Sequence, residues 1–181
     1  MKTRLRPAHT QSQLSEIYFR PHQHTQFADH ILRVNKSIEL LKAFNKYDRI
    51  GDLSAGDATI INSLKADKKY IGDFAPGYEF TGGIDETIVN MPNVDLFICS
   101  ETLEHLDDPD TTLKAIRAKT KYLFISTPKG EDNNNNLEHY WSWDDVDVKE
   151  MLMKAGFNPV IYFLLELKKD YHYDYQMWIC E

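Results

Sequence analysis

The sequence contains only two cysteines, Cys99 and Cys180, among its 181 residues, and no apolar run that could cross a bilayer. Two thiols are too few for a disulfide framework or a cysteine-based zinc cluster. Because both lie in apolar runs, we expect two reduced, buried side chains. A transmembrane helix needs about 20 consecutive apolar residues, and the polar sequence after residues 1–6 contains no signal-peptide hydrophobic region. These absences predict a soluble, cytoplasmic protein that does not bind membranes.

The sequence also lacks an excess of positive charge. Its 21 lysine and arginine residues are outnumbered by 28 acidic residues, which gives a net charge of −7 and a pI near 5.5. A broad basic surface for nucleic acid is therefore excluded, although a local basic groove is compatible with these counts. Hydrophobic residues make up 42% of the chain, which excludes a disordered protein, and a length of 181 residues corresponds to one folded domain. The one low-complexity tract, Asn133–Asn136, predicts an exposed loop.

Apolar runs and segments with helical periodicity alternate along the chain after about residue 27. We expect strands over residues 47–53, 69–74, 78–81, 94–100, 122–126, 160–167 and 171–180, and helices over residues 27–44, 57–66, 109–118 and 143–155. Only residues 168–170 join the last two strands, and so short a link allows only an antiparallel hairpin. The pattern predicts an α/β fold with a Rossmann-like, doubly wound sheet of about seven strands and a C-terminal antiparallel hairpin.

Two of the expected helices have recognisable faces or ends. In the helix over residues 143–155, Ser142 is the expected N-cap, Asp145 follows three residues later, and Gly156 comes just after the last turn. The helix over residues 27–44 has apolar side chains at steps of three and four, which predicts one buried face: Phe27, Ile31, Val34, Ile38 and Leu41.

The segment before this helix has a different character. Residues 1–22 are polar, so we expect an N-terminal arm or lid, followed by a single domain over residues 23–181. Residues 20–24 (R-P-H-Q-H), together with His30 and Arg33, have the composition of a positively charged lid for an anionic substrate. The alternative for this cluster is a solvated helix start.

A helix is missing between the second and third expected strands. Only residues 75–77 separate them, whereas a parallel crossover normally takes a dozen or more residues. Either an extended link crosses the sheet edge, or the third segment is a loop. Both alternatives leave one face of the sheet to be covered by the N-terminal helix or by a second subunit of a homodimer.

Two aspartates at strand ends predict a nucleoside-binding site. Residues 52–58 (D-L-S-A-G-D-A) form a turn of small residues between a strand and a helix, and small residues allow a ligand to approach the backbone. Asp73 ends the next strand, twenty-one residues after Asp52. An acid near that interval can accept hydrogen bonds from both hydroxyls of a ribose. Each feature alone is commonplace, and Asp73 is equally suited to capping a turn; it is the pairing that is informative.

Four segments in order resemble the class I S-adenosylmethionine-dependent methyltransferases from about residue 47 onward. The first motif of that family is usually D-x-G-x-G-x-G, and this chain keeps Asp52 and Gly56 but has Ser54 and Ala58 in place of glycine. The second segment, S-E-T-L-E-H-L-D-D-P from Ser100 onward, is close to the S-E-V-L-E-H-L-x-D-P pattern of a large branch. Two further segments, L-F-I-S-T-P-K and E-H-Y-W-S-W…A-G-F, resemble the fifth strand and the closing region.

The resemblance implies S-adenosylmethionine as the cofactor, bound across the carboxyl ends of the first, second and fourth strands. Each part of the cofactor has expected neighbours: Asp52, Ser54 and Gly56 beside the methionine part, Asp73 at the ribose hydroxyls, Ile84 and Asp85 beside adenine, and Ser100 and Glu101 near the sulfonium. In the family an acidic residue usually stands beside adenine. Asp85 is expected at that position, and the alternative is that Gly83 occupies it. The implied acceptor is a hydroxyl or amine of a small molecule, and the acidic pI argues against a nucleic acid.

His105 and His139 are the candidate catalytic residues. His105 follows the fourth strand, where an imidazole with an ordinary pKa near 6.5 can take a proton from an acceptor hydroxyl. His139 lies in the loop after the fifth strand and could approach the same cleft. The alternative for His105 is a structural role, in which it caps the next helix or bonds a backbone carbonyl.

Two other functions remain open from the sequence. Glu101, Glu104 and His105 form an E-x-x-E-H segment, and His139 is a distant histidine. Together they resemble the metal site of the small-RNA 3′-terminal 2′-O-methyltransferases. Metal-free relatives, however, share the same E-x-x-E-H segment. For this reason we expect no metal as the leading case. The altered glycines and the missing helix are also compatible with a binding module that has kept the fold and lost methyl transfer.

Overall fold

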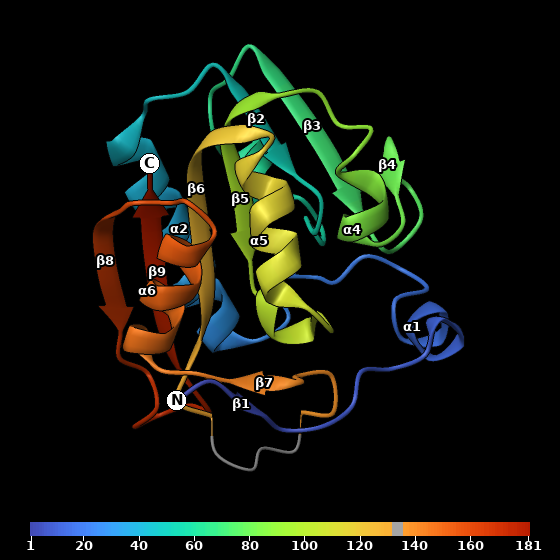
Figure 1. Ribbon diagram of the computed structural model, residues 1–181, viewed down its shortest axis with the longest axis vertical. Helices are drawn as coiled ribbons and strands as arrows, with labels where there is room; N and C mark the ends of the chain where they lie inside the picture. The colour runs from blue at the N-terminus through green and yellow to red at the C-terminus, as the bar shows by residue number, and fades with distance from the viewer. Residues whose placement is uncertain (132–135) are drawn as a thin grey trace.

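The computed structural model describes residues 1–131 and 136–181, so most of the predicted asparagine loop lies outside the described residues. The described chain forms a seven-stranded sheet of order β4-β3-β2-β5-β6-β9-β8 (Figure 1). Its strands are β2 (Arg49–Asp52), β3 (Lys68–Asp73), β4 (Phe80–Thr81), β5 (Val94–Ser100), β6 (Thr120–Lys129), β8 (Pro159–Leu165) and β9 (Asp174–Cys180). Strands β2 to β6 are parallel, and β9 is antiparallel to β6 and β8. The predicted doubly wound sheet with its terminal hairpin is confirmed.

Helices cover both faces of the sheet (Figure 1). The helices α2 (Ala28–Phe44) and α3 (Thr59–Asn62) lie on one face, and α4 (Ile84–Thr87), α5 (Pro109–Arg117) and α6 (Asp145–Lys154) lie on the other. The central strand β5 serves both cores, because successive side chains of a strand point to opposite faces. Leu96 and Ile98 join the core under α2, and Phe97 and Cys99 join the core under α5.

The link between β3 and β4 contains no helix, as expected. The third strand is shorter than predicted, and it pairs only with the last two residues of β3, Gly72 with Phe80 and Asp73 with Thr81. The chain therefore has to return by only about two residues, or roughly 7 Å, to start a parallel strand, so no crossover helix is needed. Gly72 permits this close pairing, because a Cβ there would lie 2.6 Å from the Phe80 carbonyl oxygen.

The N-terminal residues run along the carboxyl ends of the parallel strands (Figure 1). Strand β1 (Thr3–Arg4) pairs antiparallel with β7 (Trp141–Ser142), and helix α1 (Gln11–Ile17) follows it. The Leu5 N–H donates to the Tyr140 carbonyl at 2.8 Å. The short 3₁₀ helix η1 (Leu103–His105), which comes after β5, lies next to β7.

Several local predictions need correction. Helix α6 is capped by Asp144, not by Ser142, because Asp144 and Asp147 exchange side-chain and backbone hydrogen bonds in a capping box, whereas Ser142 belongs to β7. On α2, Phe27 and Ile31 are exposed, because the buried face includes the polar Arg33 and Ser37 instead. The hypothesis of a solvated helix start is therefore wrong at Arg33.

The expectations for the cysteines are confirmed. Cys99 and Cys180 are both free and buried. Among the described residues, no helix is long and apolar enough to span a membrane.

Candidate functional site

Asp52 and Asp73 end two neighbouring parallel strands, so both carboxyl groups lie at the same end of the sheet. Asp52 is 3% exposed, and its Oδ1 accepts a hydrogen bond from the Ser54 N–H at 3.1 Å. Burial raises the pKa of Asp52 to about 7, and the Asp73 charge acts in the same direction. Asp73 accepts hydrogen bonds from the N–H groups of Gly56 at 2.8 Å and Ala75 at 2.9 Å, and burial raises its pKa. The Asp73 carboxylate thus fixes the turn that follows β2.

That turn is also in contact with the N-terminal part of the chain. Gly56 has a φ of 55°, and a Cβ there would lie 2.9 Å from the His22 carbonyl oxygen. The His24 N–H donates to the Asp57 carboxylate at 3.1 Å, and the His24 Nε2 lies 3.2 Å from the Ala55 carbonyl oxygen. Glycine is required at this position because it combines a left-handed backbone with close approach of another segment.

Ile84 and Asp85 begin α4, next to the end of β4. The Ile84 side chain is buried in the core beneath α5. The Thr112 hydroxyl of α5 donates to the Asp85 Oδ1 at 2.5 Å. The Ile84 side chain is therefore taken up by the core and the Asp85 side chain by its hydrogen bond with α5. The expected contact with adenine is left to the backbone of α4.

The end of β5 carries a directed chain of hydrogen bonds. The Arg33 Nη1 donates to the Ser100 Oγ at 2.6 Å, the Ser100 and Ser126 hydroxyls lie 2.8 Å apart, and the Ser126 hydroxyl donates to the Glu101 Oε1 at 3.0 Å. Burial raises the pKa of Glu101 to about 7, although the Arg33 charge opposes this shift. Glu101 has a φ of 51°, and such a left-handed non-glycine residue is typical of functional sites.

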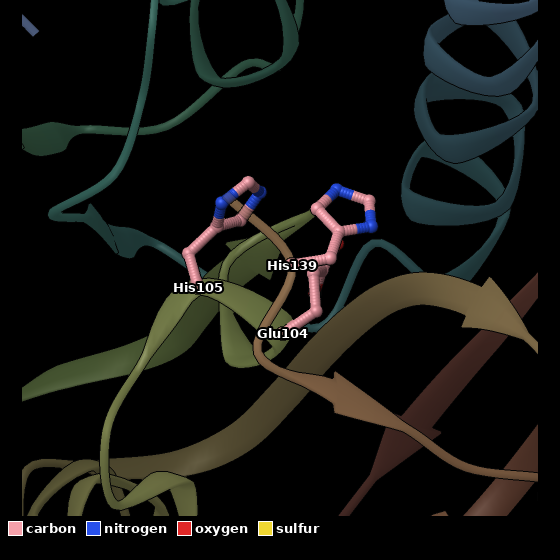
Figure 2. A group of neighbouring side chains, drawn as sticks. All are labelled: Glu104, His105 and His139. Atoms are coloured by element: carbon pink, nitrogen blue, oxygen red, sulfur yellow. The ribbon is translucent and has the colours of Figure 1, made fainter. Parts of the chain in front are cut away.

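Glu104, His105 and His139 form a compact group (Figure 2). One potential ligand atom from each residue lies within 4.8 Å of the other two. Glu104 is fully buried; its Oε2 accepts a hydrogen bond from the Thr127 hydroxyl at 3.0 Å, and its Oε1 has no hydrogen-bond partner. Burial raises the pKa of Glu104 well above its ordinary value, and the Glu101 charge adds to this effect. An orphaned carboxylate oxygen beside two imidazoles can accept either a proton or a cation.

Both imidazoles of this group are neutral at pH 7. Burial lowers the pKa of His105 to about 3 and that of His139 to about 4, and each therefore has one nitrogen free to accept a proton or a metal ion. Their rings meet edge to face, with centroids 4.7 Å apart. The His139 Nδ1 lies 2.7 Å from the Glu131 carboxylate. The Tyr18 hydroxyl lies 3.3 Å from the His105 Nδ1 and donates to the Glu138 carboxylate at 2.8 Å.

Tyr18 is a site residue that sequence reasoning missed. It follows α1 in a polar segment that has no periodic pattern, so the sequence carries no signal that this half-buried side chain lies beside a histidine. Thr127 and Glu131 were missed as well. Both follow the apolar part of β6, the fifth predicted strand, and this position could have indicated them.

The comparisons with known proteins give matches in structure alone. No family model matches the sequence, and no curated protein matches it. Magnesium protoporphyrin IX methyltransferase from Synechocystis PCC 6803, solved with bound S-adenosylhomocysteine, is similar with a TM-score of 0.66, 12% identity and 93% of each chain covered. The chain has the fold of the S-adenosylmethionine-dependent methyltransferases. This methyltransferase fold agrees with the resemblance carried by the four sequence segments.

Two other solved structures show that proteins of this fold include enzymes with different reactions. The 1,6-didemethyltoxoflavin-N1-methyltransferase of Burkholderia thailandensis matches with a TM-score of 0.62 and 16% identity, over 81% of this chain and 76% of that chain. The cyclase SpnF matches with a TM-score of 0.67 and 10% identity, over 98% of each chain. Because a cyclase shares the methyltransferase fold, the reaction has to be argued from the site.

Proposed function

We propose that this protein transfers a methyl group from S-adenosylmethionine to a hydroxyl or amine of a small-molecule acceptor. The observation that carries the proposal is the pair Asp52 and Asp73 at the ends of adjacent parallel strands, with the Gly56 turn between them. Each oxygen of Asp73 accepts one backbone hydrogen bond and keeps a second lone pair, so the carboxylate can still accept from ribose hydroxyls. These residues therefore fit the nucleoside part of the cofactor.

The chemistry asks little of the protein. The cofactor, when bound, supplies a methyl group that is already activated on a sulfonium. The residues of this chain have to orient the acceptor, exclude water and take up a proton. His105 is the proposed base, because it follows Ser100 and Glu101 on the segment expected near the sulfonium. Burial, which lowers its pKa to about 3, opposes protonation, whereas the nearby Glu138 charge favours the protonated form that proton transfer would create. His139, whose ring contacts that of His105, is the proposed second group for the same proton.

Titration calorimetry with S-adenosylhomocysteine tests the cofactor assignment. We expect micromolar binding by the wild type and at least tenfold weaker binding by D73N, because an amide oxygen is a weaker acceptor for two ribose hydroxyls than a carboxylate. Asp95, near the opposite end of β5, accepts hydrogen bonds from Asp48 and Arg49, and the D95N variant is the matched control. Absence of binding at millimolar ligand would remove the proposal.

A second candidate is transfer assisted by a divalent cation, as in methylation of a ribose 2′-hydroxyl at an RNA end. It is favoured by the group of Glu104, His105 and His139, in which one potential ligand atom of each residue lies within 4.8 Å of the others, and by the Glu104 Oε1, which has no hydrogen-bond partner. One carboxylate and two imidazoles suit a transition metal better than Mg²⁺. In this case His105 would be a ligand and not a base, so the two candidates are exclusive at that residue.

Chelation separates the two candidates. The leading proposal predicts that methyl transfer survives EDTA and that Mn²⁺ gives no calorimetric binding at the site. The metal-assisted candidate predicts loss of transfer with EDTA, recovery with Mn²⁺, and loss of Mn²⁺ binding in E104Q and H139A. The exposed His172 provides the control variant H172A, which both candidates predict to be unchanged. A protein that binds S-adenosylhomocysteine but methylates no acceptor from metabolite or RNA pools, with or without metal, would be a binding module.

A further inference from the structure

Glu131 is a buried acidic residue on the loop between β6 and β7. Its side chain is 2% exposed, and that of His139, on the same loop, is 7% exposed. The Glu131 Oε1 lies 2.7 Å from the His139 Nδ1, a distance typical of a charge-assisted hydrogen bond. The bond that one ring nitrogen makes decides which of the two nitrogens of a neutral imidazole carries the hydrogen. The partner of Nδ1 therefore determines what Nε2 can do.

The backbone of Glu131 is anchored to β7 and the residue that follows this strand. The Gly130 N–H donates to the Trp143 carbonyl at 2.9 Å. The Ser142 hydroxyl donates to the carbonyl of Glu131 itself. These bonds fix the segment from which the carboxylate extends, so the side chain is held beside His139 by the fold. A group that positions another side chain needs such support, because a loosely held partner would not select one orientation of the ring.

The surroundings of Glu131 favour the imidazole as the donor of this hydrogen bond. The Tyr173 hydroxyl also donates to Glu131, and burial together with the Glu131 charge raises the pKa of Tyr173 to about 12. Burial and the Arg6 charge both lower the pKa of His139, so a permanent cation lies close to the pair. A nearby cation favours the ionised form of a carboxyl group. An ionised carboxylate has only acceptor oxygens, which leaves the His139 Nδ1 as the donor.

We propose that Glu131 is a positioning residue that holds the neutral His139 as its Nδ1–H tautomer, with the lone pair on Nε2. The assignment rests on the proposed function and deepens it, because it names the nitrogen of His139 that is available for the reaction. The His139 ring faces the His105 ring, with centroids 4.7 Å apart (Figure 2). With Nδ1 taken by Glu131, Nε2 is the nitrogen left for this shared space. The metal-assisted candidate needs the same tautomer, since a histidine ligand usually donates its other N–H to a neighbouring acceptor.

The test reads the tautomer from the ring ¹⁵N chemical shifts of histidine-labelled protein at pH 7, with the His139 signals assigned by their loss in H139Q. We expect the hydrogen on Nδ1 in at least about nine-tenths of the wild-type molecules. E131Q keeps the size of the side chain but brings an amide N–H that can donate to Nδ1, so we expect this fraction to fall below about half. E150Q, which changes an exposed glutamate of α6, keeps the wild-type fraction. The wild-type spectrum alone can overturn the assignment, whether or not E131Q folds.

The outcomes distinguish this assignment from the function beneath it, because the spectrum needs neither cofactor nor acceptor. If the wild type carries the hydrogen on Nε2, Glu131 is the donor and its proposed role is wrong. If E131Q keeps the wild-type fraction, the carboxylate has only a structural role and the proposal is overturned. If the spectra agree with the expectation but S-adenosylhomocysteine does not bind at millimolar concentration, the tautomer assignment is confirmed and the proposed function is wrong.

Discussion

At the scale of the residue, Asp52 shows how a binding site opposes stability. Its carboxyl group is buried with one backbone hydrogen bond, and burial raises its pKa to about 7. In the unfolded chain the same group has a pKa near 4. The folded state therefore binds an extra proton between about pH 4 and 7, and this contribution to stability is lost as the pH rises through that window.

We accordingly predict that D52N stabilises the protein at pH 8 and not at pH 4. A shift of about three pKa units corresponds to roughly 4 kcal/mol at most, since each unit is worth about 1.4 kcal/mol. Urea unfolding at the two pH values measures the difference. D95N provides the opposite sign, because hydrogen bonds from Arg49 lower the pKa of Asp95, so its contribution is lost as the pH falls. Equal effects of D52N at both pH values would contradict a raised pKa.

Residue patterns predicted some parts of the site better than others. Asp52, Asp73 and Glu101 could be placed because each ends or follows a strand, and parallel strands bring their carboxyl ends together. Arg33 could not be placed as a buried group, because a charged residue near the polar start of a helix has the same pattern as a solvated one. It is buried because its guanidinium reaches Ser100 at the end of β5 and the Tyr175 ring on β9, and these tertiary contacts leave no periodic pattern in the sequence.

At the scale of the element, the predicted bounds of a strand or helix agree best with the observed bounds where the segment is apolar. Strand β5 has the predicted bounds because its centre, residues 96–99, is an unbroken apolar run, whereas β6 extends to Lys129 through polar residues that pair with β9. Helix α6 begins two residues later than predicted, because Ser142 pairs with Thr3 in β1 and Asp144 is left as the cap. These differences come from tertiary pairing that local propensity does not contain.

The contact between the N-terminal segment and the turn after β2 gives a prediction at this scale. Gly56 and Gly130 have similar φ values of 55° and 61°, but a Cβ at Gly56 would meet the His22 carbonyl oxygen whereas nothing lies within 4 Å at Gly130. Alanine at either position introduces left-handed strain of about 1–2 kcal/mol. We expect G56A to lower the free energy of unfolding by at least about 1 kcal/mol more than G130A in urea titrations. Equal losses would mean that the segment does not pack on the turn.

At the scale of the whole molecule, the sheet order places β2 and β5 side by side at its centre, between β3 and β6. The turns after β2 and β5 therefore meet at one end, which the N-terminal segment crosses (Figure 1). The alternation of strands and helices was enough to predict this doubly wound fold. It was not enough to predict the acceptor. The N-terminal segment contributes residues near the site, such as Tyr18 and His22, and these residues belong to no periodic pattern or motif. A homodimer remains a prediction.

The most direct test of the account is a crystal structure of the protein with S-adenosylhomocysteine. We predict that the ribose hydroxyls lie within hydrogen-bond distance of the Asp73 carboxylate, which also accepts from the Gly56 N–H, and that the amino-acid end lies beside the turn after β2. A ligand bound anywhere other than the carboxyl ends of β2, β3 and β5 would contradict the central claim.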